Sequence, residues 1–436
     1  MWAGATLLLA LFGCSNKNDK EIQGGGTYSP IITGIQSDHE PAIRGAANEL
    51  TVLVTNVNNY PLTYHWKAGA GTLADSTTAT VTWTAPDSVG SFPVTVSIEA
   101  DDGAGTHFFR STTFQIFVEN ETVRWTQSTD VQFDEAPTPS GGIIFAQFRD
   151  ISAGTSDLYS VAAPGLGPEL LTTGFERAYS PTVRADGGKM VFVGRVNLAD
   201  TLMLWIAPAT GTNLGAVPEE TYRFTAPKIS PAHRLVGSPR FSLESNWLLY
   251  DSDSSSGGSP RLWYQQDTYS PISPVKVVTS PNGSYWNSNW GPDVDHDGFP
   301  DSIVCQGISF FGQNGQVPRG LLKFASVAGQ SDTGPWLNDL GATEPDWSPD
   351  GLHIVFVRKN LIGDRDIWII NAASSNPNDA VRVTRGPADD AHPRFSADGT
   401  KIYFVSNRGN KYGLNGVYDT ERRGTNIWSV ARFDKP

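Results

Sequence analysis

The sequence predicts an all-β protein in which an N-terminal β-sandwich precedes a six-bladed β-propeller. Two observations predict this fold class: about ninety residues of short alternating strands follow the N-terminus, and one line of sequence recurs six times in the remainder. The composition agrees, because 44 glycines and 29 prolines suit a turn-rich chain and 11% of aromatic residues suits strands. At 436 residues the chain is long enough for more than one core.

Residues 28–119 carry the sandwich prediction. Their strand-like runs read "ELTVLVTNV", "LTYHWKAGAG", "TATVTWTAP", "FPVTVSIEADDGAG" and "STTFQIFVEN". Apolar and polar residues alternate along these runs, as they do in strands that bury one face between two sheets, and Trp66 is placed to fill that space. No cysteine pair accompanies Trp66, so the segment resembles the bacterial Ig-like and PKD-like domains. That resemblance implies a spacer or a weakly adhesive module.

Residues 120–436 repeat one plan six times. Each copy has a proline or polar residue, an aromatic or turn residue, a polar turn with glycine, and an apolar strand. The copies read "DEAPTPSGGIIFAQF", "AYSPTVRADGGKMVFVGR", "VGSPRFSLESNWLLYDSD", "NSNWGPDVDHDGFPDSIVCQG", "TEPDWSPDGLHIVFVRK" and "AHPRFSADGTKIYFVSNR". The prolines fall at 137, 181, 239, 345 and 393, with Ser288 in the fourth copy, so the intervals are 44, 58, 49, 57 and 48 residues. Six copies at this period predict a radial array of blades.

Local structure explains the repeated line. Asp-Gly in "SPDG" and "SADG" supplies the positive φ of a tight hairpin, because glycine has no Cβ to clash there. The runs "IVFV" and "IYFV" that follow are expected to be strands near the hub, buried on both faces by neighbouring blades. Trp368 and Trp428 in the next strands are expected to pack between blades.

The last two copies resemble the repeat of TolB-type six-bladed propellers, the PD40 or WD40-like repeat family. "SPDGLHIVFV" with "DRDIWII", and "RVTRGPADDAHPRFSADGTKIYFVSNRG" with "NIWSV", carry the resemblance, which covers about 300 residues and is distorted in the fourth copy. It implies a closed ring in which the strand at 121–127, "ETVRWTQ", completes the final blade. It also implies the binding of protein partners in the bacterial envelope, although TolB has an α/β domain where this chain has a sandwich.

The N-terminus resembles that of a bacterial lipoprotein. Residues 1–14 form a short apolar run that ends in "LFGC", which is similar to the lipobox, and the resemblance implies cleavage and lipidation at Cys14. Residues 15–27 then read as a flexible tether. This predicts a membrane attachment through an N-terminal lipid anchor in the cell envelope, at the outer membrane, on its periplasmic or its surface face. The alternative is a buried N-terminal element with a chance cysteine.

The fourth copy replaces the usual turn with "DVDHDGFPD". Carboxylates stand at positions one, three, five and nine of this loop, glycine stands at position six, and a main-chain carbonyl is available at position seven; the residues are Asp293, Asp295, Asp297, Asp301, Gly298 and Phe299. Oxygen ligands at this spacing wrap hard cations, so the loop predicts a structural Ca²⁺ site. It is not an EF-hand, because position twelve is Val304. The alternative is a solvated acidic hairpin. Cys305 after the loop is expected to be a small buried core residue.

The propeller analogy places the residues before each repeated proline at the mouth of the central channel. They are Glu135, Tyr179, Gly237 or Ser238, Asn287, Glu344 and His392. Such a set could bind a polar peptide or a sugar, and it could equally be a hydrated channel mouth. The seven histidines show no HExxH spacing, and no GxSxG sequence occurs, so no zinc hydrolase or serine hydrolase is indicated.

The balance of 32 basic against 45 acidic residues gives a net charge of −13 without a long basic cluster, which argues against nucleic acid as a partner. The leading hypothesis is a lipid-anchored, non-enzymatic envelope protein whose TolB-like propeller binds protein or peptide partners. Two alternatives stay open. One is a propeller enzyme that acts on polysaccharide through Glu135, Glu344 and His392, and the other is a carbohydrate-binding module.

Overall fold

The computed structural model describes residues 29–37, 42–128, 130–209, 214–215, 222–224, 236–243, 247–253, 260–266, 275–277, 283–310, 316–326, 328–332, 334–359, 365–385, 388–408 and 425–432. Within them the regular structure is β, apart from one turn of 3-10 helix at Pro377–Asp379. The chain divides into two compact units, the first consisting mainly of the residues up to Glu121 and the second mainly of those from Thr122 onward.

The first unit is a sandwich of two four-stranded sheets. One sheet has the order β1 (Ile31–Ser37), β3 (Ala47–Thr55), β6 (Thr80–Thr84) and β5 (Thr72–Leu73), and the other has the order β2 (Ala42–Ile43), β8 (His107–Glu119), β7 (Gly90–Asp101) and β4 (Leu62–Ala68). All neighbours are antiparallel except β2 and β8. Trp66 lies in the core between the sheets, as predicted, and it is joined there by Trp83. The Ig-like or PKD-like relationship itself stays a prediction.

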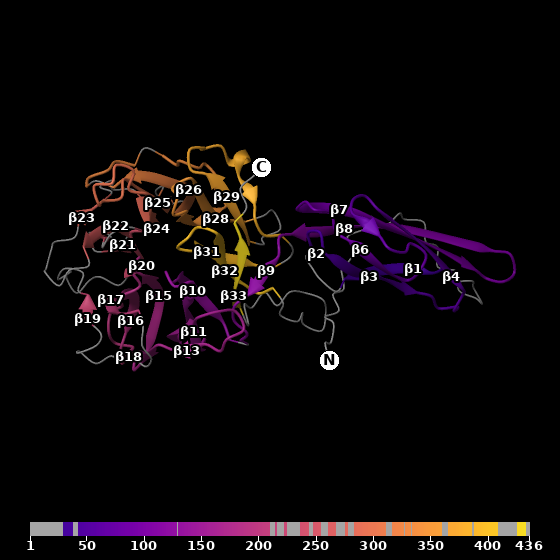
Figure 1. Cartoon of the computed structure of the whole chain (residues 1–436), viewed down its shortest axis with the longest axis horizontal. Helices are drawn as coiled ribbons and strands as arrows, with labels where there is room; N and C mark the ends of the chain where they lie inside the picture. Colours follow the sequence, from indigo (N-terminus) through magenta and orange to yellow (C-terminus); the bar gives the residue numbers. More distant parts are fainter. Residues whose placement is uncertain are drawn as a thin grey trace. The chain divides into compact units, whose positions relative to one another are not determined.

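The second unit contains six antiparallel blades (Figure 1). Blade one is β10 (Gln132–Pro137), β11 (Ile143–Asp150), β12 (Thr155–Val161) and β13 (Glu169–Leu170); blade two is β15 (Arg177–Val183), β16 (Lys189–Arg195), β17 (Met203–Pro208) and β19 (Tyr222–Phe224). One parallel pairing, of Ser156 with Arg177, joins the two blades. Blade three is β20 (Val236–Phe241), β21 (Trp247–Ser252), β22 (Arg261–Gln266) and β23 (Val275–Lys276); blade four is β24 (Gly283–Trp290), β25 (Ser302–Phe310) and β26 (Gln316–Ala325).

Blade five is β27 (Ala342–Trp347), β28 (His353–Lys359), β29 (Arg365–Asn371) and β30 (Val381–Arg382). Blade six is β31 (Asp390–Phe395), β32 (Lys401–Ser406), β33 (Asn426–Ala431) and β9 (Thr122–Arg124). A short parallel pair, β14 (Thr172–Thr173) with β18 (Leu214–Gly215), lies outside the blades. The innermost strands β10, β15, β20, β24, β27 and β31 contact one another in that order, and β31 contacts β10, so the ring is closed.

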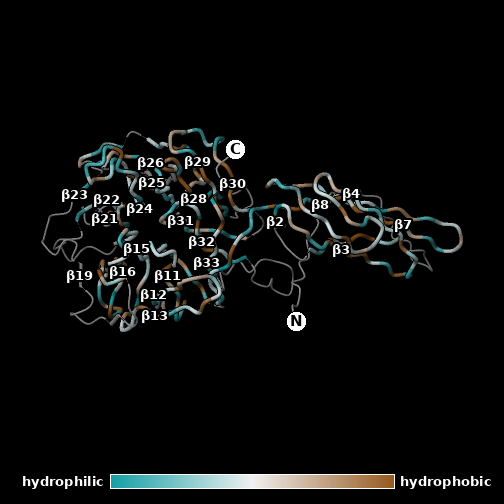
Figure 2. Tube along the Cα trace, in the orientation of Figure 1, coloured by the Kyte–Doolittle hydropathy of each residue, from teal (hydrophilic) through white to brown (hydrophobic). Residues whose placement is uncertain are grey.

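Each joint between neighbouring blades is filled by its own apolar cluster. Strand β28 shows how: Ile354 and Phe356 belong to the cluster shared with blade four, whereas Val355 and Val357 belong to the cluster shared with blade six. All four side chains are fully buried. A strand between two blades has no solvent face, which explains why "IVFV" does not alternate. Figure 2 shows the same concentration of apolar residues along the strands of the propeller.

The two tryptophans expected between blades are found there. Trp368 packs against the cluster between blades four and five, and Trp428 packs against the one between blades five and six. The runs "IVFV" and "IYFV" form the second strands of their blades, β28 and β32. The innermost strands are instead the segments that contain the repeated proline.

Strand β9 completes the last blade from the other end of the chain. Residues 122–124 pair antiparallel with residues 428–430 of β33, which confirms the predicted closure. Trp125 then enters the core: its indole Nε1 donates to Ser429 Oγ at 3.0 Å, and its ring meets Tyr403 edge-on at 5.2 Å between centroids. This pairing covers the exposed edge that β33 would otherwise present.

We expect the substitution Trp125→Ala to lower the free energy of unfolding of the propeller by about 3–5 kcal/mol, because it empties a fully enclosed site at the closure. The exposed Val123 on the adjoining strand is the control, since Val123→Ala should change stability by no more than about 0.5 kcal/mol. Urea unfolding of both variants, followed by tryptophan fluorescence, measures the difference. Equal stability of the two variants would show that Trp125 does not secure the ring.

Candidate functional site

A bulge interrupts the innermost strand of every blade at the same place. In each blade, pairing with the second strand skips two residues, and the first of them has a φ between 45° and 54°. These residues are Asp134, Ser180, Ser238, Asn287, Glu344 and His392. A non-glycine residue with positive φ is uncommon, so six of them at equivalent positions indicate a constraint imposed by the fold. The bulge re-aims a polar side chain in each blade.

These six residues form the bulge ring, and the structure places in it four of the residues predicted for the channel mouth: Ser238, Asn287, Glu344 and His392. In blade one the equivalent residue is Asp134, not Glu135, and in blade two it is Ser180, not Tyr179. Tyr179 is the last regularly paired residue before the bulge, opposite Val193. Glu135 takes the place that proline occupies in blades two, three, five and six, while Pro137 lies two residues farther along β10.

Side chains of the bulge ring connect consecutive blades. His392 donates its main-chain N–H to Glu344 Oε2 at 2.7 Å, and its Nδ1 lies 3.3 Å from Asp134 Oδ1. Ser180 Oγ donates to Asp134 Oδ2 at 2.8 Å. Burial lowers the pKa of His392, but the carboxylates of Glu344 and Asp134 more than offset this and leave the pKa raised. Blades five, six, one and two therefore share a network in which the imidazole of His392 lies between two acids that favour its protonated form.

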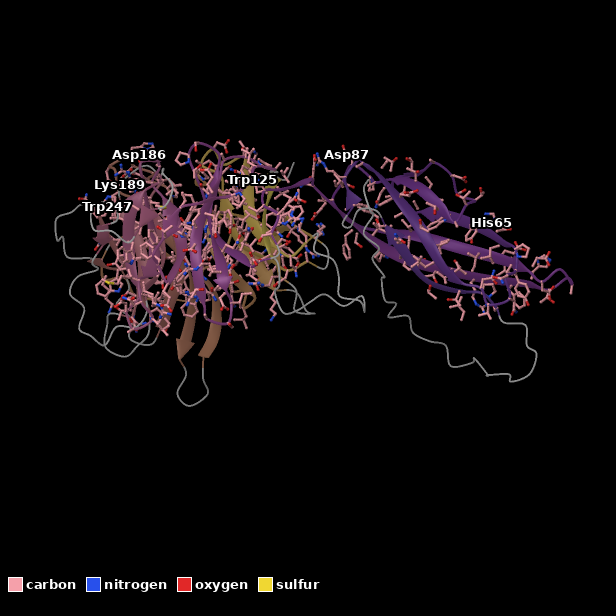
Figure 3. The ribbon with its side chains drawn as sticks, turned by 90° about the horizontal axis from the view of Figure 1, so that it is seen from below. His65, Asp87, Trp125, Asp186, Lys189 and Trp247 are labelled. Carbon is pink, nitrogen blue, oxygen red and sulfur yellow. The ribbon has the colours of Figure 1, made fainter. Side chains whose placement is uncertain are left out.

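The channel opens into a cavity of about 310 Å³ at the end where the first hairpin of each blade turns. All six blades contribute to its lining, and the lining includes four ionisable side chains: Glu135, Arg240, Asp346 and Arg394. Figure 3 identifies this edge of the propeller by Asp186 and Lys189 in the first hairpin of blade two and by Trp247 at the start of the second strand of blade three. Aromatic side chains and prolines from the hairpins complete the wall.

Glu135 is the most unusual group in the cavity. It is only 2% exposed, and neither carboxylate oxygen accepts a hydrogen bond from another residue in the described part of the chain. Burial raises the pKa of Glu135 to about 8, against the opposing effect of His392. The group is therefore mostly protonated at neutral pH, and its carboxylic acid is a hydrogen-bond donor without an acceptor among the described residues.

The other charged groups of the cavity are partly neutralised by one another. Asp346 Oδ2 accepts from Phe395 N at 2.8 Å, and Asp346 Oδ1 lies 3.7 Å from Arg394 Nη1. Burial raises the pKa of Asp346 to about 7. Asn289 Nδ2 also donates to Asp346. Burial thus favours the neutral forms of Glu135 and Asp346, and the cavity also contains the two guanidinium groups of Arg240 and Arg394.

The acidic loop of blade four lies between β24 and β25, at the same end as the cavity lining. The structure brings Asp293, Asp295 and Asp297 together, with a carboxylate oxygen of each within 4.8 Å of the others. Asp301 is not part of this group, because its Oδ2 accepts from Val294 N at 2.6 Å. Phe299 turns its ring inward, 4.8 Å from the Trp247 centroid. Cys305 is buried in the core, as predicted.

Cys14 and the rest of residues 1–28 lie outside the described residues, so the lipidation prediction is neither supported nor opposed by the structure. In the part of the chain that is described, no helix has the length and apolar character needed to span a bilayer.

Comparisons with known proteins identify no family. No protein-family model matches the sequence, and no curated protein matches it. Among solved structures, TolB from Acinetobacter baumannii is 14% identical over 77% of this chain and 75% of that chain, with a TM-score of 0.38. A putative TolB from Agrobacterium tumefaciens is 14% identical over 74% and 95%, with a TM-score of 0.30. A Dyadobacter fermentans protein of unknown function is 12% identical over 72% and 99%, with a TM-score of 0.47. The ring of six blades is established by the strand pairing within the blades and by the contacts between their innermost strands.

We expect the substitution Glu135→Gln to change how stability depends on pH. The folded protein keeps a proton on Glu135 between about pH 4.5 and pH 8 that the unfolded chain releases, so this group lowers stability as the pH rises through that window. Gln cannot ionise, and the variant should therefore lose less stability than the wild type, by up to about 1.4 kcal/mol per pH unit.

Thermal unfolding of the wild type and of this variant at about pH 5 and pH 8 measures the effect. The exposed Glu169 provides the control, because Glu169→Gln should follow the wild type. Parallel losses in the wild type and in Glu135→Gln would mean that Glu135 is ionised in the folded protein.

Proposed function

We propose that this protein is a cell-envelope binding protein whose propeller takes a segment of a protein or peptide partner into its central channel. The observation that carries the proposal is the cavity at the hairpin end, to which every blade contributes and in which Glu135, Arg240, Asp346 and Arg394 converge. Pockets of this size bind ligands through an apolar wall with a few placed polar groups. A volume of about 310 Å³ suits a few side chains rather than a folded domain.

The charge changes along the channel between the bulge ring and the cavity, which supports an extended ligand with a direction. The bulge ring has the acids Asp134 and Glu344 around His392, whereas the cavity end has Arg240 and Arg394 beside a protonated Glu135. Main-chain amides and carbonyls of a peptide can meet both donors and acceptors along such a path. We infer that a partner segment lies along the channel with an acidic group toward the two arginines.

The remaining parts of the chain complete the proposal. Lipidation at Cys14 would attach the protein to a membrane, the tether at 15–27 would give it reach, and the sandwich would act as a spacer before the propeller. Nucleic acid is not among the proposed partners, because the net charge is −13.

A polysaccharide-active enzyme or a carbohydrate-binding module is the second candidate. The observation that favours an enzyme is Glu135 itself, because a buried carboxylic acid with a pKa of about 8 has the protonation state of a general acid at neutral pH. Loss of a measured polysaccharide turnover in Glu135→Gln would establish this candidate in place of the binding protein.

The substitution Arg240→Gln tests the channel as a binding site. Peptides selected from a random library on the full-length wild type should bind this variant at least about tenfold more weakly, because a charged hydrogen bond to the ligand is lost. Lys189→Gln, in the hairpin of blade two outside the cavity lining, is the control and should bind within about twofold of the wild type. Fluorescence anisotropy measures both affinities. Selected peptides that bind the two variants equally would place the binding surface elsewhere.

The substitution Cys14→Ser tests the anchor. The wild-type protein should be recovered in the membrane fraction, whereas the variant should not. The reason is that buried acyl chains contribute about 0.8 kcal/mol per methylene to membrane binding. Fractionation of cells, with mass spectrometry of the mature N-terminus, measures the change. A wild type that is recovered without a lipid on Cys14 would contradict the anchor and would leave the channel proposal standing.

A further inference from the structure

The acidic loop of blade four contains a buried carboxylate oxygen without a partner. Asp293 is only 9% exposed, and its Oδ1 accepts no hydrogen bond within the described residues. Its other oxygen, Oδ2, accepts from Gly298 N at 2.8 Å, so the carboxylate points across the loop. An ionised carboxylate with an unsatisfied buried oxygen is costly unless a positive charge lies against it.

Two more carboxylates converge on the same place. Asp295 and Asp297 each use one oxygen to accept a main-chain N–H, from Asp297 at 3.2 Å and from Phe299 at 2.8 Å. One oxygen from each of the three aspartates lies within 4.8 Å of the others. Oxygen ligands that share one calcium ion at 2.3–2.6 Å are at most about 5 Å apart, so the spacing fits a single ion.

No basic side chain in the described part of the chain forms an ion pair with Asp293, Asp295 or Asp297. Three like charges at this separation repel one another, and the loop offers no cation of its own to offset them. In blades five and six, by contrast, the corresponding turn holds a single aspartate, Asp350 or Asp398, which accepts from a serine hydroxyl at 2.6 Å.

The loop is fixed at both ends to the propeller core. Pro292 packs against the turn of blade five so closely that a Cβ added to Gly351 would lie 2.7 Å from the proline Cγ. At the other end the Phe299 ring packs with Trp247, Tyr264 and Trp290 at centroid distances of 4.8, 5.2 and 5.8 Å. An ion held by this loop would therefore stabilise the joints of blade four with blades three and five.

We propose that the loop from Asp293 to Asp301 binds one calcium ion through the carboxylates of Asp293, Asp295 and Asp297. The main-chain oxygen of Phe299 stands at the seventh position, where such loops supply a carbonyl. Asp301 is a positioning residue, because its carboxylate is engaged with the Val294 amide and holds the loop closed. The ion neutralises the three acids and satisfies the orphaned oxygen of Asp293.

The test uses the full-length protein, first treated with a chelator and then titrated with CaCl₂ alone. Isothermal titration should show one site per chain with an affinity in the range of extracellular calcium modules, about 10⁻⁴–10⁻³ M. Several millimolar CaCl₂ should raise Tm by on the order of a few degrees, because the ion binds only the folded loop. The exposed Asp295 is suited to mutation, and Asp295→Asn should weaken binding at least about tenfold while the circular dichroism spectrum stays unchanged.

Asp186→Asn is the matched control, since Asp186 is the single turn aspartate of blade two and should leave the calcium effect intact. MgCl₂ at the same concentration should raise Tm much less, because magnesium requires a tighter octahedral shell. The proposal is overturned if CaCl₂ gives neither heat nor a shift in Tm, if MgCl₂ gives an equal shift, or if Asp295→Asn binds calcium as the wild type does. None of these measurements requires a protein or peptide bound in the central channel, so they are independent of the proposed function.

Discussion

Burial of each blade against its two neighbours is the constraint on which the rest of the structure depends. A blade such as β27 to β30 has apolar side chains on both faces, so it cannot be stable alone and must be covered from both sides. Six blades satisfy this requirement only if the ring closes, which β9 achieves by pairing with β33. Because the inter-blade clusters fill the wedges, the channel side of every innermost strand is left for polar residues.

The fold could be predicted because its signals are local and repeated. A turn with Asp-Gly, which four of the six copies contain, and an uninterrupted apolar run each have one physical explanation, and their repetition leaves little choice of architecture. The bulge residue of blade one could not be predicted by counting back from proline, because Pro137 lies two residues beyond the place that proline takes in blades two, three, five and six; the count gave Glu135 where the bulge residue is Asp134. In blade two the bulge residue Ser180 directly precedes Pro181, so it could have been predicted in place of Tyr179.

The charged cavity was missed for a related reason. Arg240, Asp346 and Arg394 each stand first after the bulge of their strands, where they resume regular pairing with the second strand. Charged residues at that strand position are the signal that could have been used, since the neighbouring strand positions are apolar. The burial of Glu135 could not be anticipated in this way, because the other blades show proline or serine there. The acidic loop, in contrast, was visible in the sequence because its ligand spacing lies within nine consecutive residues.

The location of β9 has a consequence for how the chain is made. Trp125 bonds to Ser429, and 304 residues separate them, so the first strand of the propeller stays unpaired until the C-terminal strand is present. During that interval the growing arc has two uncovered blade faces, one at each end, and each new blade covers one face and presents another. Only the last few dozen residues of the chain cover both faces. A truncated chain would therefore keep an uncovered apolar blade face at each end of its arc. The cell would have to recognise such a chain by these two apolar faces rather than by any missing residue.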